Sequence, residues 1–164
     1  MSQHVVAVCF VCLGNICRSP TAEGVFLALV KKDSLGQKIR VDSAGTSGWH
    51  VGERADRRSS ATALERGVHL PSRSRRLVLE DFELFDYLLA MDQENLENML
   101  AMAPSAQARA RVHLFRDFDA NSSKGSDVPD PYYGGPRGFD DVFDMCEASA
   151  RGLLKELRNK FKLP

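Results

Sequence analysis

The sequence predicts an α/β fold, a doubly wound four-stranded parallel sheet with helices on both faces, in a single domain over residues 1–164. Two observations lead to this prediction. Residues 5–11, VVAVCFV, are a continuous apolar run rich in β-branched side chains, which is typical of a strand buried on both faces. Segments with strand character then alternate with segments that repeat apolar residues at helical spacing, as in right-handed β–α–β crossovers.

The first helix and the strands follow in order along the chain. Ser19 is a favourable N-cap and Pro20 suits the first helical position, so we expect a helix from Pro20 to about Gly36. Its apolar face against the sheet consists of Ala22, Val25, Phe26, Leu29 and Val30. The three other strands are expected at residues 39–44, 85–91 and 112–115.

Three more helices complete the predicted fold. Residues 54–66 are expected to form one that Gly67 closes, and Asp92 caps another that Pro104 stops. The last helix begins at Phe139 and continues its apolar side with Val142, Phe143, Cys146, Leu153, Leu157 and Phe161. Ligands of such sheets bind at the carboxyl ends of the strands. Three loops are expected there, at residues 12–18, 45–52 and 130–135.

Length and composition are those of an ordinary globular protein. Apolar residues make up 43% and charged residues 27%, and 22 Lys and Arg balance 22 Asp and Glu. This balance gives no indication of nucleic acid or an acidic membrane as a partner. The polar start, the lack of a long apolar run and four cysteines without a secretory leader favour a cytoplasmic protein with reduced thiols.

The loop after the first strand carries the chemistry. It reads CLGNICRS, so Cys12 and Arg18 are separated by the five residues LGNIC. A loop that leads into a helix directs backbone N–H groups and the positive end of the helix dipole at one point, which favours an anion there and a thiolate on Cys12. Arg18 adds a planar fork that matches two phosphate oxygens. The pattern therefore predicts a nucleophile and a phosphate cradle within one turn.

The chain resembles the low-molecular-weight protein tyrosine phosphatases over nearly its whole length. The resemblance rests on four segments: CLGNICRSPTAEGVF, VDSAGTSGWHVG, FDYLLAMDQENL and DPYYGG. A Cys-x5-Arg spacing alone is a weak signal, but its combination with DSAGTSGW and DPYYGG at these positions is specific. The resemblance implies hydrolysis of phosphotyrosine through a phosphocysteine, without metal or cofactor, on the same four-stranded fold.

The resemblance also assigns the catalytic roles. Cys12 is the expected nucleophile, Arg18 binds the phosphate, and Asp130 of DPYYGG is the general acid and base. Asp130 lies in residues 116–138, a stretch without periodicity, and an Asp before Pro is often only a turn former. Asp127 is the competing carboxylate. Further loop residues are expected to bind substrate, namely Leu13, Gly14, Asn15, Ile16, Cys17 and Ser19.

Several of these loop residues have a more specific expected role. Gly14 and Asn15 permit the unusual backbone angles of such a loop. The hydroxyl of Ser19 can donate to the leaving thiolate in the second step as well as cap the helix. In the family the residue at Cys17 forms a disulfide with the nucleophile after oxidation, although a plain space-filling role is the alternative. Cys9 and Cys146 are expected to be buried structural thiols.

Residues outside the loop complete the expected site. Aromatic walls around a phenyl ring are expected from Trp49, Tyr132 and Tyr133, although Tyr133 fits a plain packing role equally well; in the family the paired tyrosines are themselves phosphorylated. Ser43 resembles a serine beneath the loop. Ser72 occupies the position where many relatives have a histidine bonded to the loop asparagine, and Ser72 or His69 could replace it. Asp92 is expected to cap a helix, and Arg73, Arg75 and Arg76 to form a solvated face.

The expected partners are tyrosine-phosphorylated proteins or small aryl phosphates, with inorganic phosphate as product and inhibitor. We expect a monomer or weak dimer that binds no nucleic acid and no membrane. The alternatives are a protein-arginine phosphatase, which tends to have threonine at Ile16, an arsenate reductase, and a phosphotyrosine-binding module without turnover. Arsenate reductases need additional cysteines, and residues 77–99 contain none. A zinc site at Cys9, Cys12 and Cys17 lacks a nearby histidine to complete four ligands.

Overall fold

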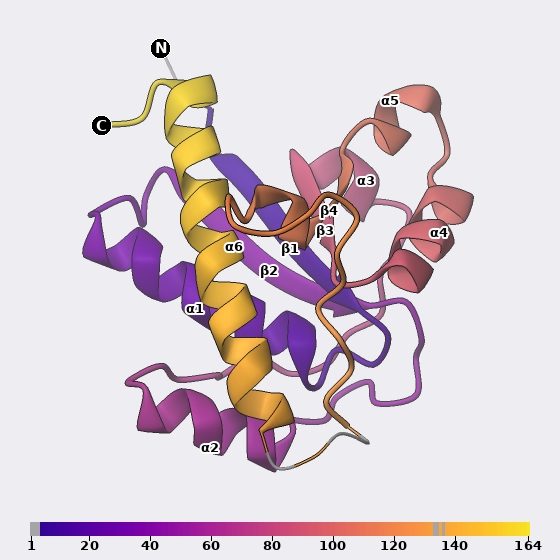
Figure 1. The fold of residues 1–164 in the computed structure, drawn as a ribbon. Helices are drawn as coiled ribbons and strands as arrows, with labels where there is room; N and C mark the ends of the chain where they lie inside the picture. Colours follow the sequence, from indigo (N-terminus) through magenta and orange to yellow (C-terminus); the bar gives the residue numbers. More distant parts are fainter. Residues whose placement is uncertain (1–3, 133–134, 136) are drawn as a thin grey trace.

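Four parallel strands form one sheet at the centre of the molecule (Figure 1). The computed structural model describes residues 4–132, 135 and 137–164. The sheet order is β2-β1-β3-β4, with every pair parallel, and its strands are β1 Val6–Cys12, β2 Ile39–Gly45, β3 Tyr87–Ala90 and β4 Val112–Leu114. The predicted four-stranded α/β fold is confirmed, although β3 is shorter at both ends than expected.

The register aligns the carboxyl ends of the strands. Cys12 at the end of β1 pairs with Gly45 at the end of β2, and Val11 pairs with Ala90 at the end of β3. The chain leaves β1 to form β2 on one side and later returns to form β3 on the other. Such a change of direction opens a crevice at the carboxyl edge of a parallel sheet. The segments that follow β1, β2 and β3 therefore meet at this edge.

Helices cover both faces of the sheet (Figure 1). One face carries α1 Arg18–Lys32, α2 Arg57–Glu65 and α6 Gly138–Phe161, while α3 Asp81–Leu84, α4 Gln93–Met102 and α5 Ala106–Arg109 pack on the other. A 3₁₀ turn, η1 Phe115–Phe118, connects β4 to the long loop before α6. None of the helices in the described part of the chain combines the length and apolar character needed to cross a bilayer.

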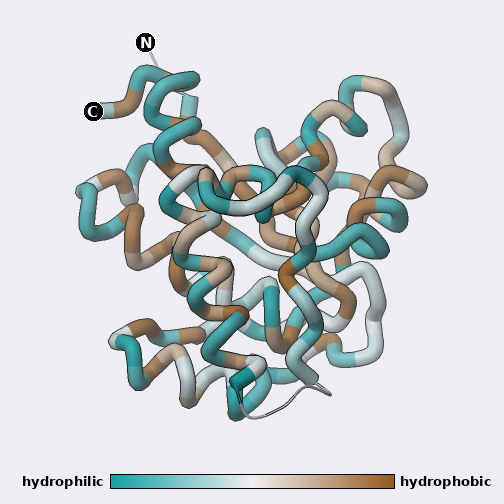
Figure 2. The backbone as a smooth tube through the Cα atoms, in the orientation of Figure 1, coloured by the Kyte–Doolittle hydropathy of each residue, from teal (hydrophilic) through white to brown (hydrophobic). Residues whose placement is uncertain are grey.

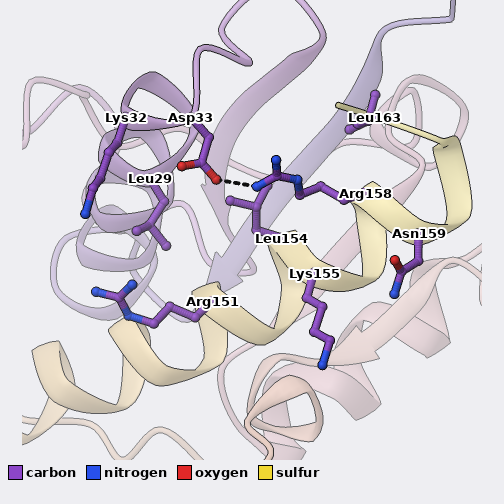
Figure 3. A pocket seen from close by; sticks show the side chains of 9 residues that line it. All are labelled: Leu29, Lys32, Asp33, Arg151, Leu154, Lys155, Arg158, Asn159 and Leu163. Atoms are coloured by element: carbon purple, nitrogen blue, oxygen red, sulfur yellow. Dashed lines mark hydrogen bonds and ion pairs between the residues drawn. The ribbon is translucent and has the colours of Figure 1, made fainter.

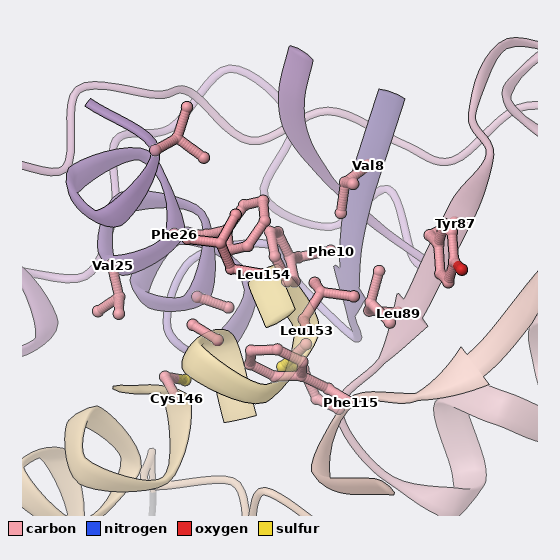
Figure 4. Close-up of a cluster of buried hydrophobic side chains, with 14 of the residues drawn as sticks. Val8, Phe10, Val25, Phe26, Tyr87, Leu89, Phe115, Cys146, Leu153 and Leu154 are labelled. Carbon is pink, nitrogen blue, oxygen red and sulfur yellow. The ribbon is translucent and has the colours of Figure 1, made fainter. Parts of the chain in front are cut away.

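The side chains of β1 divide the core into two layers, because successive residues of a strand face opposite sides. Val8 and Phe10 join the layer beneath α1 and α6, whereas Cys9 and Val11 join the layer beneath α4. Phe10 is the centre of the first layer, 5.0 Å from Phe115 between ring centroids (Figure 4). Every residue of β1 is buried, so the strand that ends at Cys12 is held rigidly from both faces.

The last helix is amphipathic as predicted. Apolar and hydrophilic residues alternate along α6 in Figure 2, and its predicted apolar residues are buried except Phe161, which is partly exposed. At Gly152 a β-carbon would lie 1.7 Å from the carbonyl oxygen of Phe118. Only glycine therefore lets η1 lie directly on α6. This contact fixes the start of the long loop that leads to Asp130.

The structure corrects several predicted helix boundaries. The first helix begins at Arg18, with Cys17 at the N-cap position and no side-chain cap, so the prediction of Ser19 as N-cap was wrong. The second helix begins at Arg57 and is capped by Asp56. Asp92 caps α4 as predicted by accepting from the Asn95 backbone. The short elements α3, α5 and η1 were not predicted, since four residues are too few to give a periodic pattern.

Candidate active site

A cavity of about 340 Å³ lies at the carboxyl edge of the sheet, above the loop between β1 and α1. The loop supplies most of its floor, and two later segments supply its walls. The residues that line it are Cys12, Leu13, Gly14, Ile16, Cys17, Arg18, Trp49, His50, Asp130 and Tyr132. The structure thus brings together nine residues from three segments that the sequence predicted for the site, and adds His50.

The Cys12 sulfur is buried at the base of the loop and has two polar neighbours. Its Sγ lies 3.0 Å from Ser19 Oγ, and it accepts a hydrogen bond from the Asn15 backbone N–H at 3.2 Å. Ser19 lies in the first turn of α1, so its hydroxyl reaches back under the loop instead of capping the helix. Both neighbours suit a sulfur that carries negative charge.

Asn15 holds the loop in shape. Its φ of 56° is left-handed, a conformation that asparagine tolerates better than most residues. Its side-chain Nδ2 donates to Ser19 Oγ at 2.8 Å and to Ser43 Oγ at 3.0 Å, and its Oδ1 accepts from the Arg75 backbone N–H at 3.0 Å. The prediction that Ser43 lies beneath the loop agrees with this contact.

These contacts determine where the Ser19 proton points. The Arg75 N–H can only donate, so the amide of Asn15 must present its oxygen there and its two N–H bonds to Ser19 and Ser43. Ser43 then donates its own proton to Glu23 Oε1 at 2.6 Å. Ser19 likewise has its proton free for Cys12 Sγ at 3.0 Å, since the one other acceptor in reach among the described residues, the Ala44 carbonyl, is 3.4 Å away.

Glu23 is a buried carboxyl that the sequence analysis missed. Burial raises its pKa, while hydrogen bonds from Ser43 and Ser72 act in the opposite direction. The signal was its position one helical turn after Ser19 and one before Phe26, on the buried side of α1. The prediction that Ser72 or His69 contacts Asn15 was wrong. Ser72 bonds to Glu23, and the Arg75 backbone takes the place beside Asn15.

Gly14 serves the loop in a different way from the one predicted. Positive φ angles of described glycines occur at Gly52, Gly67 and Gly125, so Gly14 does not need one. A β-carbon on Gly14 would instead lie 2.9 Å from Cδ2 of His50. The imidazole can therefore pack directly on the loop backbone, and its Nδ1 is 2.6 Å from Glu53 Oε2.

Arg18 is only 3% exposed and is held from three sides. Its Nη1 donates to Asp92 Oδ2 at 2.5 Å and to the Val128 carbonyl at 3.1 Å, and its Nη2 lies 3.8 Å from Asp130 Oδ2. Burial opposes the charge, but Cys12 and the two carboxylates outweigh it and raise the pKa of Arg18. Asp92 therefore does more than cap α4, which the sequence analysis did not foresee.

Asp130 lines the cavity from the opposite wall, with its side chain 43% exposed. Its Oδ1 accepts from the Tyr132 backbone N–H at 3.0 Å, so the turn-forming role and the place in the cavity coexist. Asp127 accepts instead from the Gln93 backbone at 3.0 Å and does not line the cavity. Of the two carboxylates weighed from the sequence, only Asp130 can reach a ligand there.

The walls of the cavity are aromatic and aliphatic. Trp49 is 78% exposed and stands at the rim, and Tyr132, 40% exposed, faces the cavity with the Arg58 guanidinium over its ring at 5.1 Å. Leu13 and Ile16 add aliphatic surface. The predicted wall residue Tyr133 lies outside the described residues. A flat apolar group fits these walls, because exposed aromatic faces favour stacking.

The other thiols differ from Cys12 in their surroundings. Cys17 lines the cavity but is buried, and burial raises its pKa to about 12. Cys9 and Cys146 are fully buried, and burial raises the pKa of both thiols. Cys17 therefore remains protonated at neutral pH, which makes it a poor nucleophile.

Arg75 does not belong to a solvated face, contrary to prediction. Its guanidinium binds Asp42 and Asp81, and its backbone N–H holds Asn15. Arg73 and Arg76 are exposed as expected. The sequence analysis missed these contacts because Asp42 is 33 residues away in the chain and Asp81, six residues away, has no helical or strand spacing to Arg75.

A second cavity, of about 490 Å³, lies between α1 and α6 (Figure 3). Its lining includes the Arg158–Asp33 ion pair at 2.7 Å but no cysteine, serine or histidine. In the described residues, no three or more His, Cys, Asp or Glu side chains gather in a way that could hold a metal ion. Of these two cavities, only the one at Cys12 places a cysteine beside a buried arginine and a carboxylate.

Comparisons with known proteins agree with this geometry. A family model described as low molecular weight phosphotyrosine protein phosphatase matches residues 7–163. A relative from Streptomyces coelicolor named low molecular weight protein-tyrosine-phosphatase is 44% identical over 154 residues, covering 93% of this chain and 94% of that protein.

Solved structures show the same similarity. A protein tyrosine phosphatase from Entamoeba histolytica superimposes with a TM-score of 0.90 at 39% identity, covering 94% of this chain and 98% of that one. A Drosophila arginine phosphatase superimposes with a TM-score of 0.85 at 31% identity, covering 92% and 97%. Proteins with this fold are thus named both as tyrosine phosphatases and as arginine phosphatases.

Proposed function

Because this chain belongs to the low molecular weight phosphotyrosine protein phosphatase family, we propose that it hydrolyses phosphotyrosine through a phosphocysteine on Cys12. The observation that carries the proposal is the surroundings of the sulfur. Cys12 Sγ receives the Asn15 N–H and the Ser19 hydroxyl, while Arg18 and Asp130 line the same cavity. A nucleophile, an anion-binding fork and a proton donor are thus within reach of one bound phosphate.

In the first step the Cys12 thiolate attacks phosphorus, and the bond from phosphorus to the tyrosine oxygen breaks. Arg18 and the loop amides bind the equatorial oxygens, whose charge is greatest in the transition state. Asp92 and Val128 hold the guanidinium in place for this. Asp130 gives its proton to the leaving phenolate, a contribution of about 10²–10⁴-fold in comparable enzymes.

In the second step water attacks the phosphocysteine. Asp130, now a carboxylate, takes a proton from the water, and the Cys12–phosphorus bond breaks to give inorganic phosphate and the thiolate. The Ser19 hydroxyl stabilises that leaving sulfur, since its proton already points toward Cys12 Sγ. Free phosphate can occupy the same cradle, so we also propose product inhibition.

The cavity walls favour phosphotyrosine over phosphoarginine. Trp49 and Tyr132 offer ring faces, and Ile16 offers an aliphatic surface where a polar residue would suit a guanidinium better. The Drosophila relative named as an arginine phosphatase makes the comparison necessary. The proposed substrates are tyrosine-phosphorylated proteins of the cytoplasm or small aryl phosphates, and the proposed active unit is a monomer or weak dimer.

The test is a panel of phosphotyrosine, phosphoserine and phosphoarginine peptides, assayed with wild type and Cys12→Ser. We expect phosphotyrosine to be cleaved fastest and turnover to vanish in the variant, because a serine hydroxyl is not ionised at neutral pH. Circular dichroism of Cys12→Ser provides the folding control. Turnover near the wild-type rate in this variant would exclude the covalent route, and a preference for phosphoarginine would replace the proposed substrate.

A further inference from the structure

A pair of arginines lies directly opposite each other beside the cavity. Residues 52–54 and 73–74 form a short antiparallel contact in which Arg54 pairs with Arg73. Side chains directly opposite in such a contact are about 5 Å apart at their β-carbons and project to the same side, and like charges there destabilise each other. Both side chains are exposed.

Neither guanidinium has its charge balanced by a carboxylate of the described residues. Within the part that the structure describes, no carboxylate forms an ion pair with Arg54 or Arg73, and Arg73 Nη1 donates only to the Gly52 carbonyl at 3.0 Å. The nearest carboxylates in sequence are engaged elsewhere: Glu53 binds His50 and Asp56 binds Arg58. An anion from outside would therefore relieve a repulsion that the fold leaves in place.

Hydrogen bonds of the neighbouring residues connect the arginine pair to the lining of the cavity. Ser74, next to Arg73, donates through its hydroxyl to the Gly14 carbonyl at 2.9 Å. The Glu53 backbone N–H, next to Arg54, donates to the His50 carbonyl at 2.9 Å, and His50 is a cavity wall. The pair thus lies within a few residues of two lining groups.

The neighbouring surface extends the positive charge toward the tryptophan. Arg76 lies along Gly48, with its Cδ 3.6 Å from where a β-carbon of that glycine would be, next to Trp49 at the rim. The whole chain has a formal net charge of zero, so this surface is a local excess and not a general property. Such a local field attracts acidic ligands from solution.

We propose that Arg54 and Arg73 bind carboxylate side chains that flank the phosphotyrosine, so that the enzyme selects phosphotyrosines in acidic segments of its protein substrates. An extended peptide rises about 3.3 Å per residue, so a side chain two to four residues from the phosphotyrosine can reach the pair from the cavity. This inference rests on the proposed function, since it names the substrate class of the same site. Under this proposal, residues outside the phosphate-binding loop select the amino-acid sequence of the substrate.

The test compares three phosphotyrosine peptides that differ only in having Glu, Gln or Lys two to four residues from the phosphotyrosine. We would measure kcat/KM for wild type, Arg54→Gln, Arg73→Gln and the double variant. Phenyl phosphate, which has no flanking residues, is the reference substrate. Arg109→Gln is the matched control, because Arg109 also donates one hydrogen bond to a backbone carbonyl, that of Leu100 at 2.9 Å, and precedes β4 at the amino edge of the sheet.

We expect wild type to have a higher kcat/KM for the Glu peptide than for the Gln peptide. In Arg54→Gln and in Arg73→Gln this ratio should fall about two- to fivefold, the range for exposed charge pairs, and the fall should appear in KM. Rates on phenyl phosphate should stay unchanged, and 0.5 M salt should weaken the preference. Equal kcat/KM for the three peptides in wild type, or an equal loss in Arg109→Gln, would overturn the inference and leave the proposed function intact. Absence of turnover with every peptide and with phenyl phosphate would overturn both.

Discussion

Glu23 Oε1 accepts a 2.6 Å hydrogen bond from Ser43 Oγ, and this contact sets the direction of the hydrogen bonds beneath the loop. With its proton on Glu23, Ser43 can only accept from Asn15. Asn15 then keeps its second N–H for Ser19, whose proton points to Cys12. A carboxyl that does not line the cavity thereby orients the hydroxyl that we propose stabilises the leaving thiolate.

Replacement of Glu23 should separate this orienting role from packing. Glu23→Gln keeps an oxygen that can accept from Ser43, so we expect kcat within about twofold of wild type. Glu23→Leu removes the acceptor, and we expect kcat to fall about fivefold, the equivalent of one hydrogen bond of about 1 kcal/mol. The fall should appear in hydrolysis of the phosphoenzyme, measured by burst kinetics with an activated aryl phosphate. Equal kcat in both variants would contradict the role.

Glu23 should also give stability a pH dependence. Its folded pKa is raised by burial, so the folded state holds the proton more tightly than the unfolded chain. Stability therefore falls as pH rises from the ordinary glutamate range through the raised folded pKa. Glu23→Gln should remove this decline, which thermal melting of both proteins at a series of pH values would detect. Parallel curves for the two proteins would count against it.

Asp130→Asn should slow substrates with poor leaving groups more than substrates with good leaving groups. The amide cannot protonate a phenolate, so we expect phosphotyrosine peptides to lose about 10²–10⁴-fold in kcat/KM, and substrates with good leaving groups far less. Asparagine also forms turns, so the Tyr132 contact should persist and folding should be unaffected. Asp127→Asn is the control. A greater loss from Asp127→Asn, or equal slowing of good and poor leaving groups, would remove the acid role from Asp130.

Asp92→Asn should weaken phosphate binding without unwinding α4. Asparagine remains a good N-cap, but one oxygen cannot serve both the Asn95 N–H and Arg18 Nη1. We expect inhibition by inorganic phosphate to weaken about tenfold or more, since a buried charge loses its partner. Asp92→Ala should weaken phosphate equally and in addition lose about 1 kcal/mol of stability with the cap. Unchanged phosphate inhibition in Asp92→Asn would exclude this role.

Ile16→Thr should shift selectivity toward phosphoarginine. A hydroxyl in the wall can bond to a guanidinium, whereas the aliphatic side chain favours a ring. The measurement is the ratio of kcat/KM for phosphotyrosine and phosphoarginine peptides, which should fall about threefold or more. Ile16→Val, which keeps the apolar branched shape, serves as the control. If both variants leave the ratio at its wild-type value, another residue selects the substrate.

Local patterns explain what could be predicted from the sequence. The continuous apolar run of β1 and the Asp92 cap depend on neighbours in the chain, so they were predicted nearly as the structure has them. The placement of Ser19 was wrong because its hydroxyl binds Cys12 and Asn15 in preference to the helix end. Glu23, His50 and the second contact of Asp92 depend on residues brought together only by folding. Helical spacing places Glu23 on the buried side of α1, but it does not reveal which residues it contacts.

The guanidinium of Arg18 joins three distant parts of the chain, since it bonds Asp92 and the Val128 carbonyl from its place in the first helix. Only the folded chain can bind an anion at this guanidinium, because the unfolded chain does not bring the three parts together. We therefore expect phosphate or a phosphorylated protein, at concentrations above its dissociation constant, to raise the melting temperature by mass action. In a cell, the supply of substrate would then protect the enzyme from unfolding and from proteases that attack unfolded chains.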